Sequence, residues 1–238
     1  MLNNANEPMT EAQPNATDNA VSTTEAKQKQ HAPRQAREVN PALEKLFELH
    51  PKLFGARFLP LKLGIFHDLL ARHPDAFKKD ELKLAMGQHA RSTRYLECVA
   101  AGLARHDLDG AAVESVAPEH VHHAILEVFR RRQARSKDDL RPRLTMLLKQ
   151  AIENSGLALE DYAALVRVQD EATNALLDDA MAELKAEAAK REALMVTFQT
   201  SGKTEAEFAD MYGMDLKLVS NVLARVRVDQ AAKTAVPT

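Results

Sequence analysis

The 238-residue chain has no tryptophan, one cysteine, eight glycines and an aromatic content of only 5%. So few aromatic residues, beside 45% apolar residues, predict one or two modest helical domains, and the scarce glycines argue against a β-rich protein. The lone thiol of Cys98 permits no intramolecular disulfide and fits a reducing compartment. The chain opens with no secretory signal pattern and has no apolar run near the roughly 18 residues of a membrane span. We therefore expect a soluble, cytoplasmic protein without membrane contact.

The formal net charge of −2 hides an uneven distribution. Residues 1–40 carry 4 basic and 5 acidic residues, residues 41–135 carry 15 and 12, and residues 136–238 carry 13 and 17. The middle segment is therefore basic, and it also holds eight of the nine histidines. Because local fields matter more than the total charge, the composition does not exclude a nucleic-acid partner.

The composition divides the chain into three parts. Residues 1–38 are rich in Asn, Gln, Thr, Ala, Glu and Pro, which predicts a disordered polar tail because such a segment buries too little to offset its ordering entropy. Residues 39–135 are expected to form a compact helical domain. Residues 136–238 are more acidic and rich in Ala, Leu and Glu, which predicts a helical C-terminal region.

Apolar spacing, caps and turn residues predict the elements of the middle domain. Asn40 and Pro41 open a first helix that Pro51 ends, and Ser92 is the expected N-cap of a fourth helix. Asp109-Gly110 is a turn dipeptide, which predicts a small β-hairpin. The expected elements are helices at 41–50, 61–73, 80–88 and from 92, a hairpin at 105–116, and a helix from Pro118 to Arg132.

Two helical segments and a helix-turn-helix-like pattern are expected in the C-terminal region. One helix covers 140–155 and ends at Gly156, and a long helix, broken at most once, covers 159–199. Ala209, Gly213 and Val219 in residues 204–227 have the spacing of a helix-turn-helix, which a plain helical hairpin also produces. This end is therefore either a nucleic-acid reader or a helical hairpin.

The segment Arg91-Ser92-Thr93-Arg94 lies at an expected helix start. Helix N-termini offer free backbone N–H groups to anions, and arginines pair with phosphates. The alternative is that Ser92 only caps the helix and the arginines are solvated. His89 and Tyr95 are the nearby rings on which an RNA base could stack, although Tyr95 is equally compatible with a core position.

Three blocks in this region resemble the ProQ/FinO family of bacterial RNA chaperones: Pro60-Leu61-Lys62-Leu63-Gly64-Ile65-Phe66, Ser92-Thr93-Arg94-Tyr95-Leu96 and Arg105-His106-Asp107-Leu108-Asp109-Gly110. The resemblance covers about residues 41–132. It implies a mostly α fold, a compact FinO-like domain with a small β-hairpin. It also implies binding of structured small RNAs and mRNA 3′ ends at a terminator-type hairpin and its 3′ single-stranded tail.

The resemblance also implies roles for individual residues. Lys62 would contact the RNA backbone, Arg94 and Tyr95 would lie at a 3′-end pocket, and Arg105 would stand on the hairpin beside it. His89 takes a place where the family has Tyr or His, and Asp107 and Asp109 would shape the hairpin. The expected RNA-binding residues are Lys62, Arg72, His89, Arg91, Ser92, Thr93, Arg94, Tyr95 and Arg105.

One departure from the family falls in this site. Ala90-Arg91 stands where the family has a threonine followed by a small polar residue, so one hydroxyl is lost and one cation is added. We expect this change to weaken specific hydrogen bonding in the pocket and to add nonspecific attraction for phosphates.

Other site chemistry finds little support in the sequence. His106, His120, His122 and His123 do not have the spacing of a metal site, since adjacent histidines on a helix point in different directions. Glycine-rich phosphate loops and hydrolase or metalloprotease motifs are missing. We therefore expect no enzyme, no cofactor and no metal. The alternative function is a protein-interaction or DNA-binding regulator that works, or self-associates, through the C-terminal helices.

Overall fold

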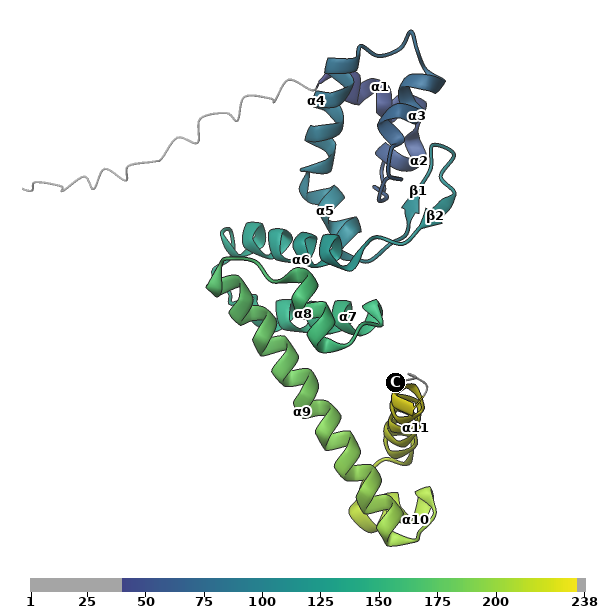
Figure 1. The fold of residues 1–238 in the computed structure, drawn as a ribbon, viewed down its shortest axis with the longest axis vertical. Helices are drawn as coiled ribbons and strands as arrows, with labels where there is room; N and C mark the ends of the chain where they lie inside the picture. Colours follow the sequence, from purple (N-terminus) through teal and green to yellow (C-terminus); the bar gives the residue numbers. More distant parts are fainter. Residues whose placement is uncertain (1–39, 235–238) are drawn as a thin grey trace, which may run out of the picture. The chain divides into compact units, whose positions relative to one another are not determined.

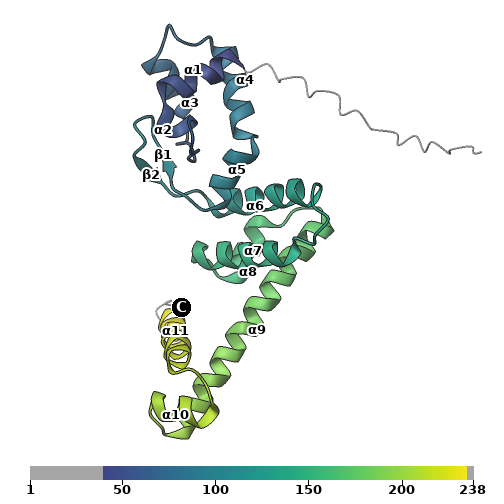
Figure 2. The ribbon, with the colours of Figure 1, turned by 180° about the vertical axis from the view of Figure 1, so that it is seen from behind.

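The computed structural model describes residues 40–234, so the expected disordered tail at residues 1–38 lies outside the described residues. The first part contains α1 (Pro41–Leu49), α2 (Pro51–Phe54), α3 (Ile65–Arg72), α4 (Lys79–Ala90), α5 (Thr93–Ala100), β1 (Arg105–His106) and β2 (Ala112–Glu114). The second part contains α6 (Pro118–Gln133), α7 (Arg141–Ser155), α8 (Leu159–Val166), α9 (Glu171–Ser201), α10 (Glu205–Tyr212) and α11 (Leu216–Thr234). The predicted fold class, mostly α with a small hairpin and a helical extension, is confirmed (Figure 1, Figure 2).

Side-chain caps start two helices where the sequence predicted them. The Asn40 side chain accepts a hydrogen bond from the Ala42 backbone N–H at 3.0 Å, and Pro41 occupies the first helical position of α1. Ser92 Oγ accepts from the Tyr95 backbone N–H at 3.2 Å and caps α5. These bonds satisfy N–H groups that have no partner within their own helix.

The prediction of a helix from residue 61 is wrong for residues 61–64. The backbone N–H of Lys62 donates to the carbonyl of His106 at 2.9 Å, and Leu61 forms an isolated parallel bridge with the same residue. Gly64 then turns the chain at φ +80°, a left-handed conformation that glycine adopts without steric cost. Helix α3 therefore begins only at Ile65.

The hairpin is shorter than the predicted 105–116. Arg105 pairs with Glu114 and His106 with Ala112, with a register shift between the two pairs. Asp107 Oδ1 accepts from the backbone N–H groups of Asp109 and Ala111 at 3.0 and 2.9 Å, so this carboxylate closes the turn. A side chain predicted to shape the hairpin therefore does so through two backbone hydrogen bonds.

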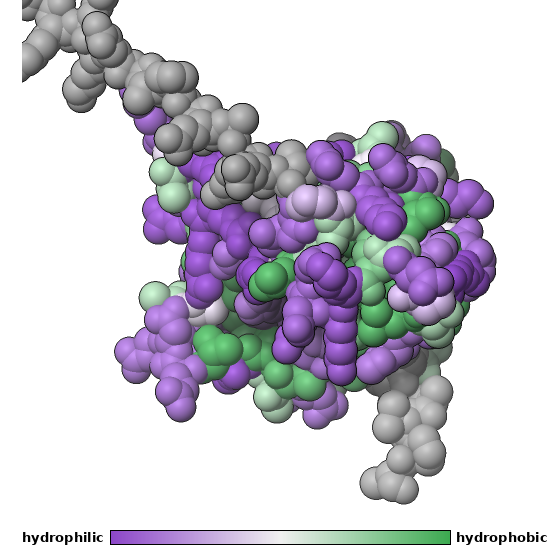
Figure 3. Space-filling model, turned by 90° about the horizontal axis from the view of Figure 1, so that it is seen from above, coloured by the Kyte–Doolittle hydropathy of each residue, from purple (hydrophilic) through white to green (hydrophobic). Residues whose placement is uncertain are grey.

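The helices before the hairpin enclose their own core. Its largest fully buried members are Leu46, Leu53, Phe54, Leu69 and Leu82. On the face that Figure 3 shows, hydrophilic residues cover most of the surface and hydrophobic residues form small patches between them. That surface suits a polar partner better than an apolar one.

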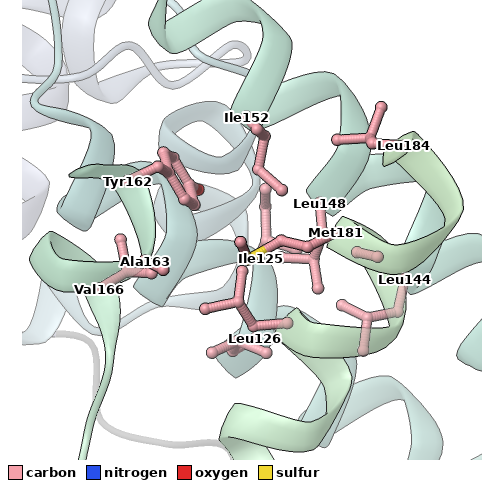
Figure 4. Close-up of a cluster of buried hydrophobic side chains, with 12 residues drawn as sticks. Ile125, Leu126, Leu144, Leu148, Ile152, Tyr162, Ala163, Val166, Met181 and Leu184 are labelled. Carbon is pink, nitrogen blue, oxygen red and sulfur yellow. The ribbon is translucent and has the colours of Figure 1, made fainter. Parts of the chain in front are cut away.

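Helix α6 is shared between two cores. On one side Ala124 packs with Val99 and Cys98 of α5. On the other side Ile125 and Leu126 join a cluster with α7, α8 and α9, which Figure 4 shows around Leu148, Tyr162 and Met181. A helix with two buried faces ties the expected domain at 39–135 to the helices that follow it.

The long helix predicted over 159–199 is broken once, between α8 and α9. Asp170 starts α9 by accepting a hydrogen bond from the Thr173 backbone N–H at 3.2 Å. Beyond α9, Gly213 at φ +64° separates α10 from α11, and Ala209 and Val219 are buried where these two helices pack on the end of α9. The chain thus has two packed helices joined by a turn here, an arrangement that fits both interpretations of residues 204–227.

Candidate nucleic-acid interface

The three sequence blocks meet at one residue, Leu61. Its backbone N–H donates to the Tyr95 hydroxyl at 3.1 Å, and its carbonyl accepts from Arg105 Nη1 at 3.0 Å. The adjoining residues complete the junction, because His106 N–H donates to the Pro60 carbonyl at 2.8 Å. Blocks far apart in the sequence are therefore joined through the backbone N–H and carbonyl of one residue, which fixes Lys62 beside the hairpin.

Tyr95 contributes its hydroxyl rather than only its ring. Because the hydroxyl accepts the Leu61 N–H, its own proton remains available, and no acceptor for it is found among residues 40–234. Burial raises the pKa of Tyr95, so the group stays a neutral donor. The residue is half-buried, with its ring 5.0 Å from that of His89.

His89 lies in the core instead of on the surface, with only 2% of its area exposed. Its ring packs against Phe54 and Phe58 with centroid separations of 4.7 and 4.5 Å. Neither ring nitrogen has a hydrogen-bond partner among the described residues. Burial, with a smaller contribution from the charge of Arg94, lowers the pKa of His89 to about 4, so the ring is neutral at pH 7. The ring therefore has no open face on which a base could stack.

Arg94 is held at the surface by two contacts. Its Nη2 donates to the carbonyl of Ala56, and its guanidinium lies over the Phe58 ring at 4.4 Å from the centroid. An arginine fixed against an aromatic ring loses less side-chain entropy when it binds an anion. Arg57, which the sequence did not single out, is exposed next to Ala56 and makes no hydrogen bond or ion pair within the described part of the chain.

Arg105 is buried, with 9% of its area exposed, and its guanidinium bonds to groups inside the domain. Besides the Leu61 carbonyl, it approaches His120 Nδ1 at 3.3 Å and Glu114 at 3.9 Å. It was expected to stand on the hairpin beside the pocket. The structure places its backbone there and its side chain at the junction.

Lys62 and Arg72 each have an acidic partner. Lys62 Nζ lies 2.9 Å from Asp68, and Arg72 makes two hydrogen bonds to Asp109, at 2.7 and 3.0 Å. The hydrogen bond from Arg72 lowers the pKa of Asp109, and the hydrogen bond to Asp68 raises the pKa of Lys62. Both cations line one hollow together with their acidic partners. A phosphate in this hollow must therefore compete with carboxylates for both cations.

The remaining expected residues lie on the other side of the start of α5. Arg91 is exposed, and its guanidinium lies beside Gly87. Thr93 Oγ1 accepts from Arg131 Nη1 at 3.2 Å, and the same nitrogen donates to the Arg91 carbonyl at 2.8 Å. Arg131 is not among the expected RNA-binding residues, since nothing local in the sequence indicates that the end of α6 meets the start of α5.

Residues 204–227 have few cations that are free of ion pairs. Arg225 pairs with Asp229 and Glu153, at 3.1 and 3.3 Å, and Arg227 pairs with Glu205 at 3.1 Å. Each of these arginines is balanced by a carboxylate, so the two add little net positive charge for phosphates. The charges of α11 therefore do not favour the nucleic-acid-reading interpretation of this segment.

Two features of the described residues bear on other chemistry. Between residues 40 and 234 no three His, Cys, Asp or Glu side chains are grouped as metal ligands. None of the helices in that range combines the length and the apolar character needed to cross a membrane.

Comparison with known proteins identifies the domain that holds this site. The sequence model of the ProQ/FINO family matches residues 36–141. These residues are a ProQ/FinO family domain. The ProQ/FinO family is non-enzymatic, which agrees with the expectation drawn from the missing catalytic motifs.

Relatives of the ProQ/FinO domain share substantial identity over a limited length. The protein named RNA chaperone ProQ of Shewanella pealeana is 42% identical over 91 residues, which are 37% of this chain and 43% of that protein. The ProQ of Idiomarina loihiensis is 46% identical over 67 residues, 27% of this chain and 32% of that protein. The chain thus spans less than half the length of these relatives.

Two solved structures are similar to part of this chain. A FinO-like RNA chaperone from Neisseria meningitidis is 30% identical, with 34% of this chain and 84% of that chain covered and a TM-score of 0.32. A ProQ homologue from Legionella pneumophila is 27% identical, with 53% and 98% covered and a TM-score of 0.35.

Proposed function

We propose that the chain is an RNA chaperone that binds structured RNA, namely terminator-type hairpins with a 3′ single-stranded tail. In this proposal it acts in post-transcriptional regulation by small RNAs, protecting the bound RNA and assisting its pairing. Chaperoning requires no cofactor, because a protein that binds RNA conformations with different affinities shifts their populations.

The observation that carries the proposal is the set of donors at the start of α5 in a ProQ/FinO domain. Arg94 is fixed on Phe58, and Tyr95 has an uncommitted hydroxyl proton. The first N–H groups of α5 add the partial positive charge of a helix N-terminus. Phosphates and ribose hydroxyls of an RNA end are the groups that such donors bind.

His89 packs against Tyr95 without offering a face to a base. The two ring nitrogens of His89 are buried and have no hydrogen-bond partner among the described residues. We infer that His89 fixes the position of Tyr95 by packing, at some cost in stability, and that the surface donors make the contacts to RNA.

The test compares the binding of the full chain to a hairpin with a free 3′ tail and to the same hairpin with a blocked 3′ end. We expect a clear preference for the free end. Arg94→Ala should weaken binding of the free-ended RNA about tenfold or more, since a charge-assisted hydrogen bond is lost. The matched control is Lys203→Ala, which removes an exposed cation outside the ProQ/FinO domain.

Equal affinity for the two hairpins would refute the proposed 3′-end pocket. Circular dichroism and thermal unfolding of the Arg94→Ala variant separate loss of binding from loss of fold, because this arginine also bonds to the Ala56 carbonyl.

A second candidate function is protein interaction or self-association through the C-terminal helices. Exposed apolar side chains on α10 and α11 favour it: Met211, Tyr212, Leu216, Leu218 and Val228. Sedimentation equilibrium of the full chain and of Leu218→Asp tests this function. A monomer that is unchanged by the substitution and retains no bound protein would exclude it.

A further inference from the structure

A second basic surface lies on the other side of the start of α5. Successive residues of a helix point about 100° apart, so Thr93 and Arg94 face different neighbours. Arg94 contacts Ala56 and Phe58, whereas Thr93 contacts α6. We call the hollow on the α6 side the arginine pocket; it is lined by Thr93, Arg131, Arg132, Arg135, Ser136 and Leu140.

The arginine pocket has a fixed wall. Arg131 is held by three hydrogen bonds: its Nη1 donates to the Arg91 carbonyl and to Thr93 Oγ1, and its Nε donates to Glu127 at 2.8 Å. The side chain is 29% exposed. These bonds leave the two N–H donors of Nη2, in a guanidinium whose position is already determined.

The loop beneath the pocket is also fixed. The Gln133 side chain donates to the Asp138 carbonyl and accepts from the Leu140 N–H, both at 2.9 Å. Ser136 Oγ accepts from the Asp138 N–H at 3.0 Å, which leaves its hydroxyl proton available. The turn after α6 is therefore held in one conformation by side chain–backbone bonds.

The charges of the arginine pocket do not cancel. Glu127 pairs with Arg131, and Glu97 pairs with Arg132 at 2.7 Å. Arg135 is exposed, and its side chain makes no hydrogen bond or ion pair within residues 40–234. Three arginines against two carboxylates leave an uncompensated cation over a site with two hydroxyl donors, which suits a singly charged phosphodiester.

We infer that the arginine pocket binds a backbone phosphate of the RNA, separately from the 3′-end pocket at Arg94 and Tyr95. Arg135 and the Nη2 donors of Arg131 pair with the phosphate oxygens, and the Thr93 hydroxyl donates the proton that its bond from Arg131 leaves free. This inference rests on the proposed RNA-binding function. It extends the RNA contact across the cap of α5, so that phosphates lie on both sides of Ser92.

The test is the salt dependence of RNA binding by the full chain, measured for the parent, Arg135→Ala and Lys137→Ala. Lys137 is exposed, lies two residues further on and does not line the pocket, so both variants lose one charge and only one loses a pocket residue. Each affinity is measured between about 50 and 200 mM salt, where the slope counts phosphate contacts.

We expect Arg135→Ala to weaken binding about three- to tenfold and to reduce the slope of log K against log salt by about 0.7 to 0.9, the loss of one phosphate contact. Lys137→Ala should change both quantities by less than half as much. Arg135→Ala should weaken the binding of hairpins with free and with blocked 3′ ends by the same factor, because a contact to the RNA backbone does not depend on the terminus.

Three results would overturn the inference while the proposed function stands. The first is a salt slope in Arg135→Ala equal to that of the parent. The second is an equal effect of Arg135→Ala and Lys137→Ala, which would indicate diffuse charge. The third is loss of the free-end preference in Arg135→Ala, which would put Arg135 in the 3′-end pocket. Failure of the parent to bind either hairpin would instead overturn the proposed function and the inference together.

Discussion

Replacing His89 by phenylalanine tests the most unusual burial in the ProQ/FinO domain. The imidazole is 2% exposed among Phe54, Phe58 and Tyr95, and both of its nitrogens lack partners in the described structure. A neutral ring that gives up its hydrogen bonds to water costs about 1 to 3 kcal/mol. Phenylalanine keeps an aromatic ring in the site and removes both polar atoms.

The pH dependence of the free energy of unfolding gives a more specific magnitude than the lost hydrogen bonds do. The folded pKa of His89 is about 4 and the unfolded value is 6.5, so only the unfolded chain takes up a proton between these two values. Protonation therefore favours unfolding as the pH falls, and the stability is fully present above pH 6.5. Between pH 7 and pH 5 this linkage amounts to roughly 2 kcal/mol from His89 alone.

The assay is urea unfolding of the parent, His89→Phe and His123→Ala at pH 7 and pH 5. We expect the free energy of unfolding to fall with pH in all three proteins, since burial also lowers the pKa of His122 to about 4. The fall should be about 2 kcal/mol smaller in His89→Phe. The exposed His123 serves as the matched control, and its variant should behave like the parent. An equal fall in His89→Phe and the parent would refute the reasoning.

Three further predictions follow from single contacts. Asp109→Asn should tighten RNA binding about two- to fivefold at low salt, because Arg72 loses its carboxylate partner and becomes available to phosphate; unchanged affinity in a titration would show that Arg72 does not contact RNA. Tyr162→Phe should lower the free energy of unfolding in urea by about 1 to 2 kcal/mol, because buried His122 loses its 3.2 Å hydrogen bond; a parent-like midpoint would contradict this. Cys98, 8% exposed with its pKa raised to about 11 by burial, should react with a thiol reagent at pH 8 only after unfolding, and rapid labelling of the native protein would count against that.

The features that could be predicted from the sequence are those that depend on local chemistry. The caps at Asn40 and Ser92 are single side chains that bond to N–H groups two or three residues away. The turn at Asp109-Gly110 and the end of α7 at Gly156 depend on glycines with positive φ. In each case the residue type and its near neighbours contain the whole physical cause.

The features that could not be predicted depend on approaches between distant segments. Residues 61–64 have helical apolar spacing, but their backbone groups pair with His106 and Tyr95, so tertiary hydrogen bonds override the local pattern. The burial of His89 is equally non-local, since polar residues are expected at the surface unless a partner is visible. The sequence places Arg131 in a basic run, and only the packing of α6 on α5 brings it to Thr93.

The two buried faces of α6 have a consequence for how the protein is made. On a ribosome the helices up to Gln133 emerge first, with Ile125 and Leu126 still uncovered. Their partners on α7, α8 and α9 follow only as synthesis proceeds to Leu184. A nascent ProQ/FinO domain therefore exposes an apolar stripe for as long as that stretch takes to translate, and its folding is completed by residues that lie outside the family domain.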